Sequence, residues 1–202
     1  MNTIEELIAN QKSYFKSQAT KDVSKRISYL KLLKKEIISN EHSIYEALNK
    51  DFKKSAFESF LSENGLVLGE IDLAISNLKK WSKPKRVKSS VLTFPSRDYI
   101  YKEPYGTVLI IGPWNYPVQL TINPLIMAIA AGNTVVIKPS ELTPNTAALI
   151  SSIIAKAFPK EYITVIMCIL CNVYCIFFVI LYLNKNHIFI LDLQSLVTLC
   201  ST

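Results

Sequence analysis

Two continuous runs of apolar, largely β-branched residues constrain the fold of this 202-residue chain more than any other feature. They are Thr107–Ile111 and Thr134–Ile137, and neither alternates between apolar and polar side chains. Strands that are apolar on both faces are typical of a parallel sheet with helices on each side, because antiparallel sheets commonly leave one face to water. The two runs therefore predict neighbouring parallel strands in an α/β fold.

The segments around these runs predict the helices that such a sheet needs. Residues 117–131 are apolar throughout and predict a buried helix that stops at Gly132. Residues 144–158 predict a second helix with Pro144 near its first turn, and residues 162–166 predict a third strand. The order strand, helix, strand, helix, strand predicts the first part of a doubly wound parallel (Rossmann-like) sheet, which is truncated in this chain.

Before the sheet, the first eighty residues carry apolar side chains at helical spacing and predict an N-terminal helical layer. A capping box formed by Thr3 and Glu6 opens the first helix. The fourth predicted helix is the longest and is closed by Pro84. Its apolar face comprises Phe57, Phe60, Leu61, Asn64, Leu68, Ile71, Ile75 and Leu78. We expect this face to pack in the core.

A short β-prone segment connects the helices to the sheet. The runs 91–94 and 98–102 flank Pro95 and Ser96, which predicts a hairpin or extended arm. The expected organisation then has four parts: a helical layer at 1–88, the arm at 89–104, the partial sheet domain at 105–166 and an apolar tail at 167–202.

The formal net charge of +7 belongs entirely to the first 161 residues. Six of the ten residues from Lys79 to Lys88 are basic, but only Trp81 is interleaved with them. Nucleic-acid sites usually combine basic and stacking aromatic side chains, so this cluster predicts a solvated helix end and linker, and no nucleic-acid partner. Glu5 and Glu6 come too early for a secretory or transit peptide, and a cytoplasmic location is expected.

Polar side chains follow both predicted strands at the point where each strand ends. Asn115 lies in the segment after the first strand, and Lys138 and Glu141 follow the second. In a doubly wound sheet the carboxyl ends of the strands border the ligand crevice, so both segments should face it. Lys138 and Glu141 suit ribose hydroxyls, and the Asn115 amide is a donor of the kind that stabilises an oxyanion.

Plainer interpretations remain open for the same residues. Asn115 is also a common turn residue, and Ser140 or Thr143 could simply cap a helix after the second strand. The glycine-rich dinucleotide fingerprint G-x-G-x-x-G does not follow the first strand. Spacing alone therefore predicts a nucleotide-binding type of α/β domain with an unidentified ligand.

Two longer motifs indicate which nucleotide-binding family the chain resembles. The segment 110–117, IIGPWNYP, and the segment 130–141, AAGNTVVIKPSE, resemble the strand-exit motifs of the aldehyde dehydrogenase superfamily. The tyrosine after Asn115 and the short N-terminus make the chain most similar to its class 3, or fatty aldehyde, branch. The resemblance spans about residues 3–166 and implies an NAD(P)-dependent oxidation of aldehydes to carboxylates through a thiohemiacetal.

The resemblance also implies roles for individual residues. Ile111, Pro113 and Trp114 would line the site of the cofactor, NAD or NADP. Lys138 and Glu141 would hold the adenosine ribose with Ser140 beside them, and Glu141 at the ribose favours NAD. Asn115 would be the catalytic oxyanion donor. The arm would belong to the family's oligomerisation element, and the intact relatives are expected to be homodimers.

Two groups essential to that chemistry are missing from the matching segment. The nucleophilic cysteine and the general-base glutamate of the family belong to the part that should follow residue 166. Cys168, Cys171 and Cys175 lie in a glycine-free apolar run that fits neither the nucleophile nor a metal site, so no metal is expected. The chain alone is predicted to be inactive. The alternative is a non-catalytic remnant that is tethered to a membrane or forms dimers.

The tail differs in composition from everything before it. Residues 162–184 contain no charged side chain and are long enough to span a membrane, although residues 163–166 also fit the third strand. All four cysteines lie beyond residue 167, whereas no glycine lies beyond Gly132. The bias toward Ile, Phe, Tyr, Asn, Leu and Cys suggests translated AT-rich DNA: a retained intron, a frameshift or a gene-model error after about Ile166. A continuous open frame in the genomic DNA there would count against this hypothesis.

Overall fold

Three parallel strands form the centre of the structure, a computed structural model that describes residues 4–167. They are β3 (Thr107–Ile111), β4 (Thr134–Lys138) and β5 (Ile163–Val165), and β4 lies between the other two. β3 and β4 pair over their whole length. The predicted α/β fold class, with the first strands of a doubly wound sheet, is confirmed.

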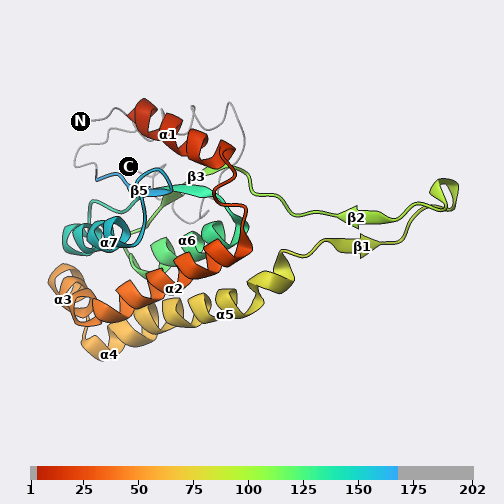
Figure 1. The fold of residues 1–202 in the computed structure, drawn as a ribbon. Helices are drawn as coiled ribbons and strands as arrows, with labels where there is room; N and C mark the ends of the chain where they lie inside the picture. Colours follow the sequence, from red (N-terminus) through yellow and green to blue (C-terminus); the bar gives the residue numbers. More distant parts are fainter. Residues whose placement is uncertain (1–3, 168–202) are drawn as a thin grey trace, which may run out of the picture.

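Helices cover both faces of this sheet (Figure 1). α6 (Gln119–Ala131) and α7 (Pro144–Ala157) lie on one face, and α1 (Ile4–Lys16) lies on the other. Successive residues of β3 serve the two faces in turn. Val108 belongs to the main core, whereas Leu109 packs with Ile8 of α1. Successive residues of a strand point to opposite faces of the sheet. Because helices cover both faces here, the residues on each face can be apolar, which explains the continuous apolar runs.

A second layer of helices packs on the outer side of α6 and α7. It consists of α2 (Val23–Ser39), α3 (Glu41–Phe52) and α5 (Gly65–Trp81), and its apolar residues join those of the sheet in one core. The first helix is not part of this layer, since α1 covers the opposite face of the sheet. Thr3 of the expected capping box lies outside the described residues.

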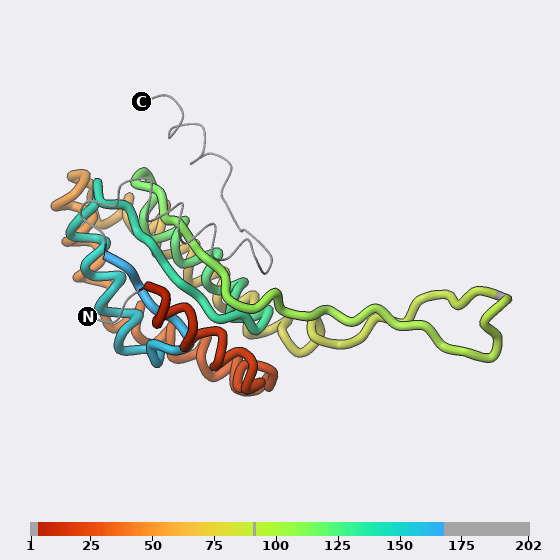
Figure 2. The backbone as a smooth tube through the Cα atoms, turned by 90° about the horizontal axis from the view of Figure 1, so that it is seen from above, coloured from red at the N-terminus to blue at the C-terminus, as the bar shows by residue number. Residues whose placement is uncertain are grey.

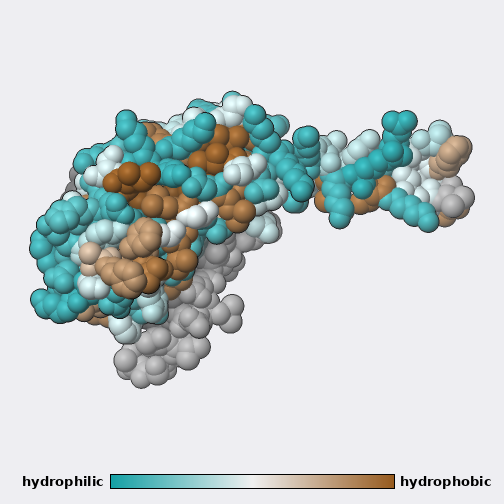
Figure 3. Space-filling model, turned by 90° about the horizontal axis from the view of Figure 1, so that it is seen from below, coloured by the Kyte–Doolittle hydropathy of each residue, from teal (hydrophilic) through white to brown (hydrophobic). Residues whose placement is uncertain are grey.

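The predicted fourth helix is interrupted by a π-helical turn. α4 (Ala56–Ser59) leads into η1 (Phe60–Asn64), and α5 follows at Gly65, whose N–H donates to the Phe60 carbonyl. The apolar face predicted here was wrong in its first half, because Phe57 is 74 % exposed and Phe60 and Leu61 are exposed too, whereas Glu63, which was not on that face, is fully buried. Asn64 is buried, as predicted. One extra residue in the turn rotates the following side chains relative to a regular helix. Apolar side chains consequently gather on the outer surface over α4, η1 and α5 (Figure 3).

A two-stranded antiparallel arm projects from the body (Figures 1 and 2). β1 (Lys85–Val87) pairs with β2 (Asp98–Ile100). The arm was predicted, but its first strand was misplaced: residues 91–93 form the 3₁₀ turn η2 (Val91–Thr93), and part of the expected basic linker forms β1. Ser89 explains the shift, since its hydroxyl donates to the Ser96 carbonyl and accepts from the Asp98 N–H, so it closes the loop between the strands.

No helix within residues 4–167 is long and apolar enough to cross a membrane. The candidate membrane segment 162–184 begins in the sheet, because β5 is hydrogen-bonded to β4 and Tyr162 is fully buried. The rest of that segment lies outside the described residues.

Candidate functional site

The segments that follow β3 and β4 lie side by side at the carboxyl edge of the sheet. Ile111 and Lys138 are register partners at the ends of the two strands. The Gly112 N–H donates to the Lys138 carbonyl at 2.9 Å, which extends the pairing by one residue. The predicted convergence of these two segments on one edge is confirmed.

Gly112 allows this close approach between the loop and α6. A Cβ atom at Gly112 would lie 2.1 Å from the Thr121 hydroxyl oxygen and 3.6 Å from the Cα of Pro139. Thr121 is fully buried in α6 and has a β-branched side chain with restricted rotamers. The position after β3 therefore has no space for a side chain, which accounts for glycine in the IIGPWNYP motif.

Lys138 and Glu141 form an ion pair across the turn that follows β4. The Lys138 side chain is largely buried, whereas that of Glu141 is about half exposed. Partial burial acts to raise the pKa of Glu141, but the hydrogen bond and the charge of Lys138 outweigh it and hold the pKa below its ordinary value. The Ser140 hydroxyl accepts the Leu142 N–H at 3.2 Å and shapes the same turn. The edge thus presents a fixed cation next to an accessible carboxylate.

The remaining predicted site residues lie on the segment that follows β3. Asn115 is exposed, and its side-chain amide has no hydrogen-bond partner among the described residues. Trp114 is 50 % exposed and stacks on Phe52 with ring centroids 6.4 Å apart. Ile111 and Pro113 are half-buried. Aromatic, apolar and amide groups of this segment are therefore exposed or half-buried at the edge of the sheet where β4 also ends.

Carboxylates from the helical layer occupy the N-termini of both helices at this edge. Glu63 accepts the N–H of Val118, the residue before α6, at 2.8 Å, and Asp51 accepts the Thr146 N–H of α7 at 2.8 Å. Thr143, a suggested capping residue, makes no side-chain cap. Sequence reasoning missed Asp51 and Glu63, because both caps lie more than fifty positions from the helix that they serve. The Val118 and Thr146 N–H groups at these helix N-termini are therefore already hydrogen-bonded within the chain and are not free to bind an anion.

The Asp51 cap predicts a pH-dependent contribution to stability. Partial burial acts to raise the pKa of Asp51, but hydrogen bonds from Asn145 and Thr146 outweigh it and lower the pKa below 3.8. A lowered folded-state pKa adds stability above the unfolded pKa, and this stability is lost as the pH falls through the folded pKa. Asp51→Ala should therefore lower the free energy of unfolding by about 1–2 kcal/mol at pH 7.

Urea denaturation followed by circular dichroism at pH 7, 5, 4 and 3 measures this difference. The gap between Asp51→Ala and the parent chain should narrow below pH 4. Asp51→Asn, which keeps one acceptor oxygen and removes the charge, should lie between them at pH 7. A gap that is the same at every pH would contradict the role of the carboxylate.

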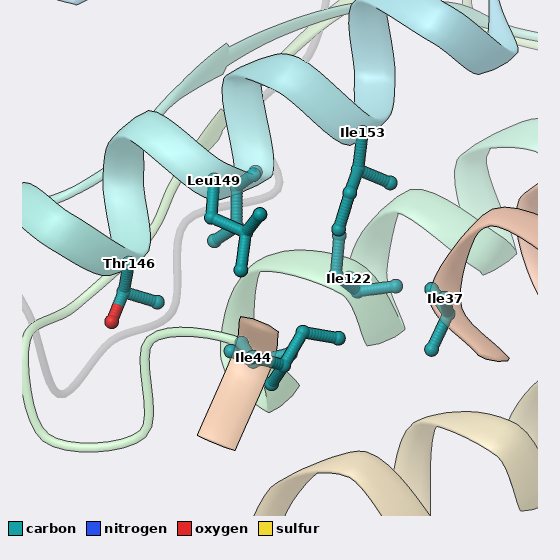
Figure 4. A pocket seen from close by; sticks show the side chains of 8 residues that line it. Ile37, Ile44, Ile122, Thr146, Leu149 and Ile153 are labelled. Atoms are coloured by element: carbon teal, nitrogen blue, oxygen red, sulfur yellow. The ribbon is translucent and has the colours of Figure 1, made fainter. Parts of the chain in front are cut away.

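A small apolar cavity lies in the core just inside this edge, since Val118 and Thr146 are among the residues that line it. It lies between α2, α3, α6 and α7 and is lined by Ile37, Ile44, Ile122, Leu149 and Ile153 among others (Figure 4). The lining includes no charged residue, so the cavity is a gap in packing and does not suit a nucleotide. No group of three or more potential metal ligands occurs within residues 4–167. Cys168, Cys171 and Cys175 lie outside the described residues.

Comparisons with known proteins agree with the motifs. The family model described as "Aldehyde dehydrogenase family" matches residues 1–168. A 4,4'-diaponeurosporen-aldehyde dehydrogenase of Staphylococcus aureus is 51 % identical over 82 % of this chain. Mouse aldehyde dehydrogenase family 3 member B1 is 38 % identical over 83 % of the chain. In both cases the matched segment is 36 % of the relative's length, so the chain spans about a third of these proteins.

Solved structures show the same relationship. A substrate-bound Staphylococcus aureus AldH superposes with a TM-score of 0.80 at 51 % identity, over 82 % of this chain and 36 % of that one. A succinic semialdehyde dehydrogenase from Streptococcus pyogenes in complex with NADP⁺ superposes with a TM-score of 0.76 over 88 % of this chain and 38 % of that one. At 17 % identity this second match shows the fold alone. The chain belongs to the aldehyde dehydrogenase family and matches the N-terminal part of its class 3 members.

Proposed function

We propose that this chain is the N-terminal segment of an NAD(P)-dependent aldehyde dehydrogenase whose intact form oxidises aldehydes to carboxylates. The observation that carries the proposal is the pairing of the two strand ends. The Gly112 N–H bonds to the Lys138 carbonyl at 2.9 Å, so the segment that leads to Asn115 and the turn that carries the Lys138–Glu141 pair begin side by side at one edge of the sheet. Membership of the family supports the reaction class.

The chemistry of the exposed groups fits the proposed cofactor. Lys138 would donate to one oxygen of the adenosine ribose and Glu141 would accept from a hydroxyl, with Ser140 holding the turn between them. Ile111, Pro113 and Trp114 would form an apolar and aromatic border. A nicotinamide cofactor, when bound, supplies the hydride acceptor for the oxidation. A carboxylate at the ribose would repel a 2′-phosphate, so Glu141 favours NAD over NADP.

Asn115 is the proposed oxyanion donor. Its exposed amide could donate to the aldehyde oxygen as negative charge develops there, which is the usual effect of a neutral donor at such a position. The nucleophile and general base would come from the part of the family fold that this chain lacks. We therefore predict that the 202-residue chain has no dehydrogenase turnover. Absorbance at 340 nm, with NAD or NADP and several aldehydes, should stay at background, and aldehyde-dependent reduction of either cofactor would overturn this.

The cofactor assignment can be tested without turnover. On titration of the ¹⁵N-labelled chain with millimolar NAD, we expect shifts of amide resonances in segments 111–114 and 138–141. Glu141→Ala should weaken the shifts at 138–141, because the ribose loses an acceptor. Lys83→Ala removes an exposed charge that lies outside both segments, so it should leave the NAD-induced shifts unchanged. Shifts confined to other segments would contradict the assignment.

A second candidate, a non-catalytic dimer-forming remnant, is favoured by the arm. Leu92 is 95 % exposed, Phe94 84 % and Tyr101 67 %, and such side chains are usually covered by a partner. Sedimentation velocity tests this candidate: the parent chain should be dimeric, and Leu92→Ser with Phe94→Ser should shift it toward monomer. Weak dimers form at a chain concentration of about 100 μM. A parent chain that stays monomeric at this concentration excludes this candidate.

A further inference from the structure

We propose that the buried Lys54–Glu63 ion pair is a positioning device that holds the segment carrying Asn115. The inference rests on the proposed function, because its purpose is to fix the oxyanion donor. The two side chains come from the loop after α3 and from the π turn η1, and neither belongs to the motifs that carry the family resemblance.

The pair contacts both ends of the Asn115 segment. Lys54 Nζ lies 2.6 Å from Glu63 Oε1 and donates to the Asn115 carbonyl at 3.2 Å. The other Glu63 oxygen accepts the Val118 N–H at 2.8 Å and the Gln119 N–H at 3.4 Å. One ion pair therefore fixes the backbone at Asn115 and at Val118, the residue before α6, which lie three residues apart.

Burial makes this contact different from an ordinary surface salt bridge. The Glu63 side chain is fully buried and that of Lys54 is 9 % exposed. Losing one partner would leave a desolvated charge, which is far less favourable than losing an exposed pair. Lys54 Nζ also lies 4.4 Å from the ring centroid of Tyr116, so the residue after Asn115 is held by the same cation.

The π turn explains how a carboxylate reaches this position. Phe60 and Leu61, at the start of the π turn, are exposed on the outer surface. The extra residue of the turn directs Glu63, near its end, toward the interior. At Gly65 a Cβ would lie 2.9 Å from the Phe60 carbonyl oxygen, so glycine accommodates the turn. π turns are often found at functional sites. The Asn115 amide remains exposed while its backbone is fixed, as an oxyanion donor requires.

Trp114 provides a local probe of this segment. The chain has two tryptophans, so the Trp81→Phe background leaves Trp114 as the only one. In this background, Lys54→Met should raise the acrylamide quenching constant of Trp114 about twofold as the segment is released. The Val118 amide should exchange with deuterium about a hundredfold faster, as expected when a buried pair loses one partner. Glu63→Gln should act in the same direction but less strongly, because the amide oxygen can still accept from Val118.

Two controls separate positioning from general destabilisation. Lys54→Arg restores a cation and should keep both readouts near parent values. Lys34→Met removes the exposed Lys34–Asp72 pair, whose nitrogen–oxygen distance is also 2.6 Å, and should change neither. If Lys54→Met does not fold, the charge-neutral double variant Lys54→Met with Glu63→Gln supplies the same measurement.

The proposal is overturned if Lys54→Met or the double variant leaves Trp114 quenching and Val118 exchange at parent values. It is also overturned if exchange in β4 and α2 rises by the same factor, since the effect would then be global. No readout uses an aldehyde or a cofactor. The positioning role of the Lys54–Glu63 pair can therefore be confirmed even if the proposed function is wrong. Equally, the NAD titration can support the proposed function even if the positioning role is overturned.

Discussion

Replacing Tyr162 with alanine is expected to lower the free energy of unfolding by about 3–5 kcal/mol. Tyr162 is fully buried just before β5. Its ring centroid lies 4.7 Å from that of Tyr29, 5.8 Å from that of Tyr14 and 5.9 Å from that of Phe158. Truncation would leave a cavity where α1, α2, α7 and the sheet meet. Urea denaturation of the 202-residue chain, followed by far-ultraviolet circular dichroism, measures the change.

Tyr162→Phe is the matched control. The Tyr162 hydroxyl is buried and has no hydrogen-bond partner among the described residues. Burial also raises the pKa of Tyr162 well above its ordinary value, so the group stays neutral. Removing an unpaired hydroxyl while keeping the ring should change stability by less than about 1 kcal/mol, or increase it. A loss as large as that of Tyr162→Ala would show that the hydroxyl, and not the aromatic packing, matters.

Gly112→Ala should destabilise the chain by about 1–3 kcal/mol, as expected for overpacking of a tight contact. The added Cβ would lie 2.1 Å from the Thr121 hydroxyl oxygen, well inside the van der Waals limit. Both the carboxyl end of β3 and the beginning of α6 would have to shift. Thermal and urea denaturation measure the loss, and the NAD titration described above shows whether the 111–114 segment has moved.

A second substitution can relieve the clash. Thr121→Ala removes the atom nearest to the new Cβ, and the Thr121 hydroxyl is itself without a hydrogen-bond partner among the described residues. The double variant should recover about half of the loss, since the Thr121 Cβ would still lie 3.3 Å away. Gly69→Ala in α5 is the control. A Cβ there meets nothing within 4 Å, so it should stabilise the helix by up to about 1 kcal/mol. Equal effects at Gly69 and Gly112 would contradict the steric explanation.

The strands and their order were predictable because they depend on local pattern. The runs at 107–111 and 134–137 carry apolar residues on both faces, and only a doubly covered sheet satisfies that pattern. Gly132 was predictable as a helix stop for a similar reason, since its φ of 93° is unfavourable for other residues. The convergence of Asn115 and Lys138 then followed from the topology of parallel strands, which end at one edge.

The half of the site that lies in the helical layer was not predictable. At residues 56–64 the apolar pattern indicated a regular helix with Phe57, Phe60 and Leu61 inward, and the π turn exposes all three. A shift of one residue is a small local change, and it is stabilised by contacts that are distant in sequence. Here those contacts are made by Glu63 with Lys54 and with the Val118 N–H.

By itself the sequence determined the sheet, the two strand-exit motifs and the family, because apolar periodicity and glycine positions act over a few neighbouring residues. Only the tertiary structure decided which carboxylates close the two helix N-termini. Asp51 reaches α7 across 95 positions and Glu63 reaches α6 across 55. A buried charge is tolerated only where partners from other elements surround it, and such partners are brought together by folding and not by spacing along the chain.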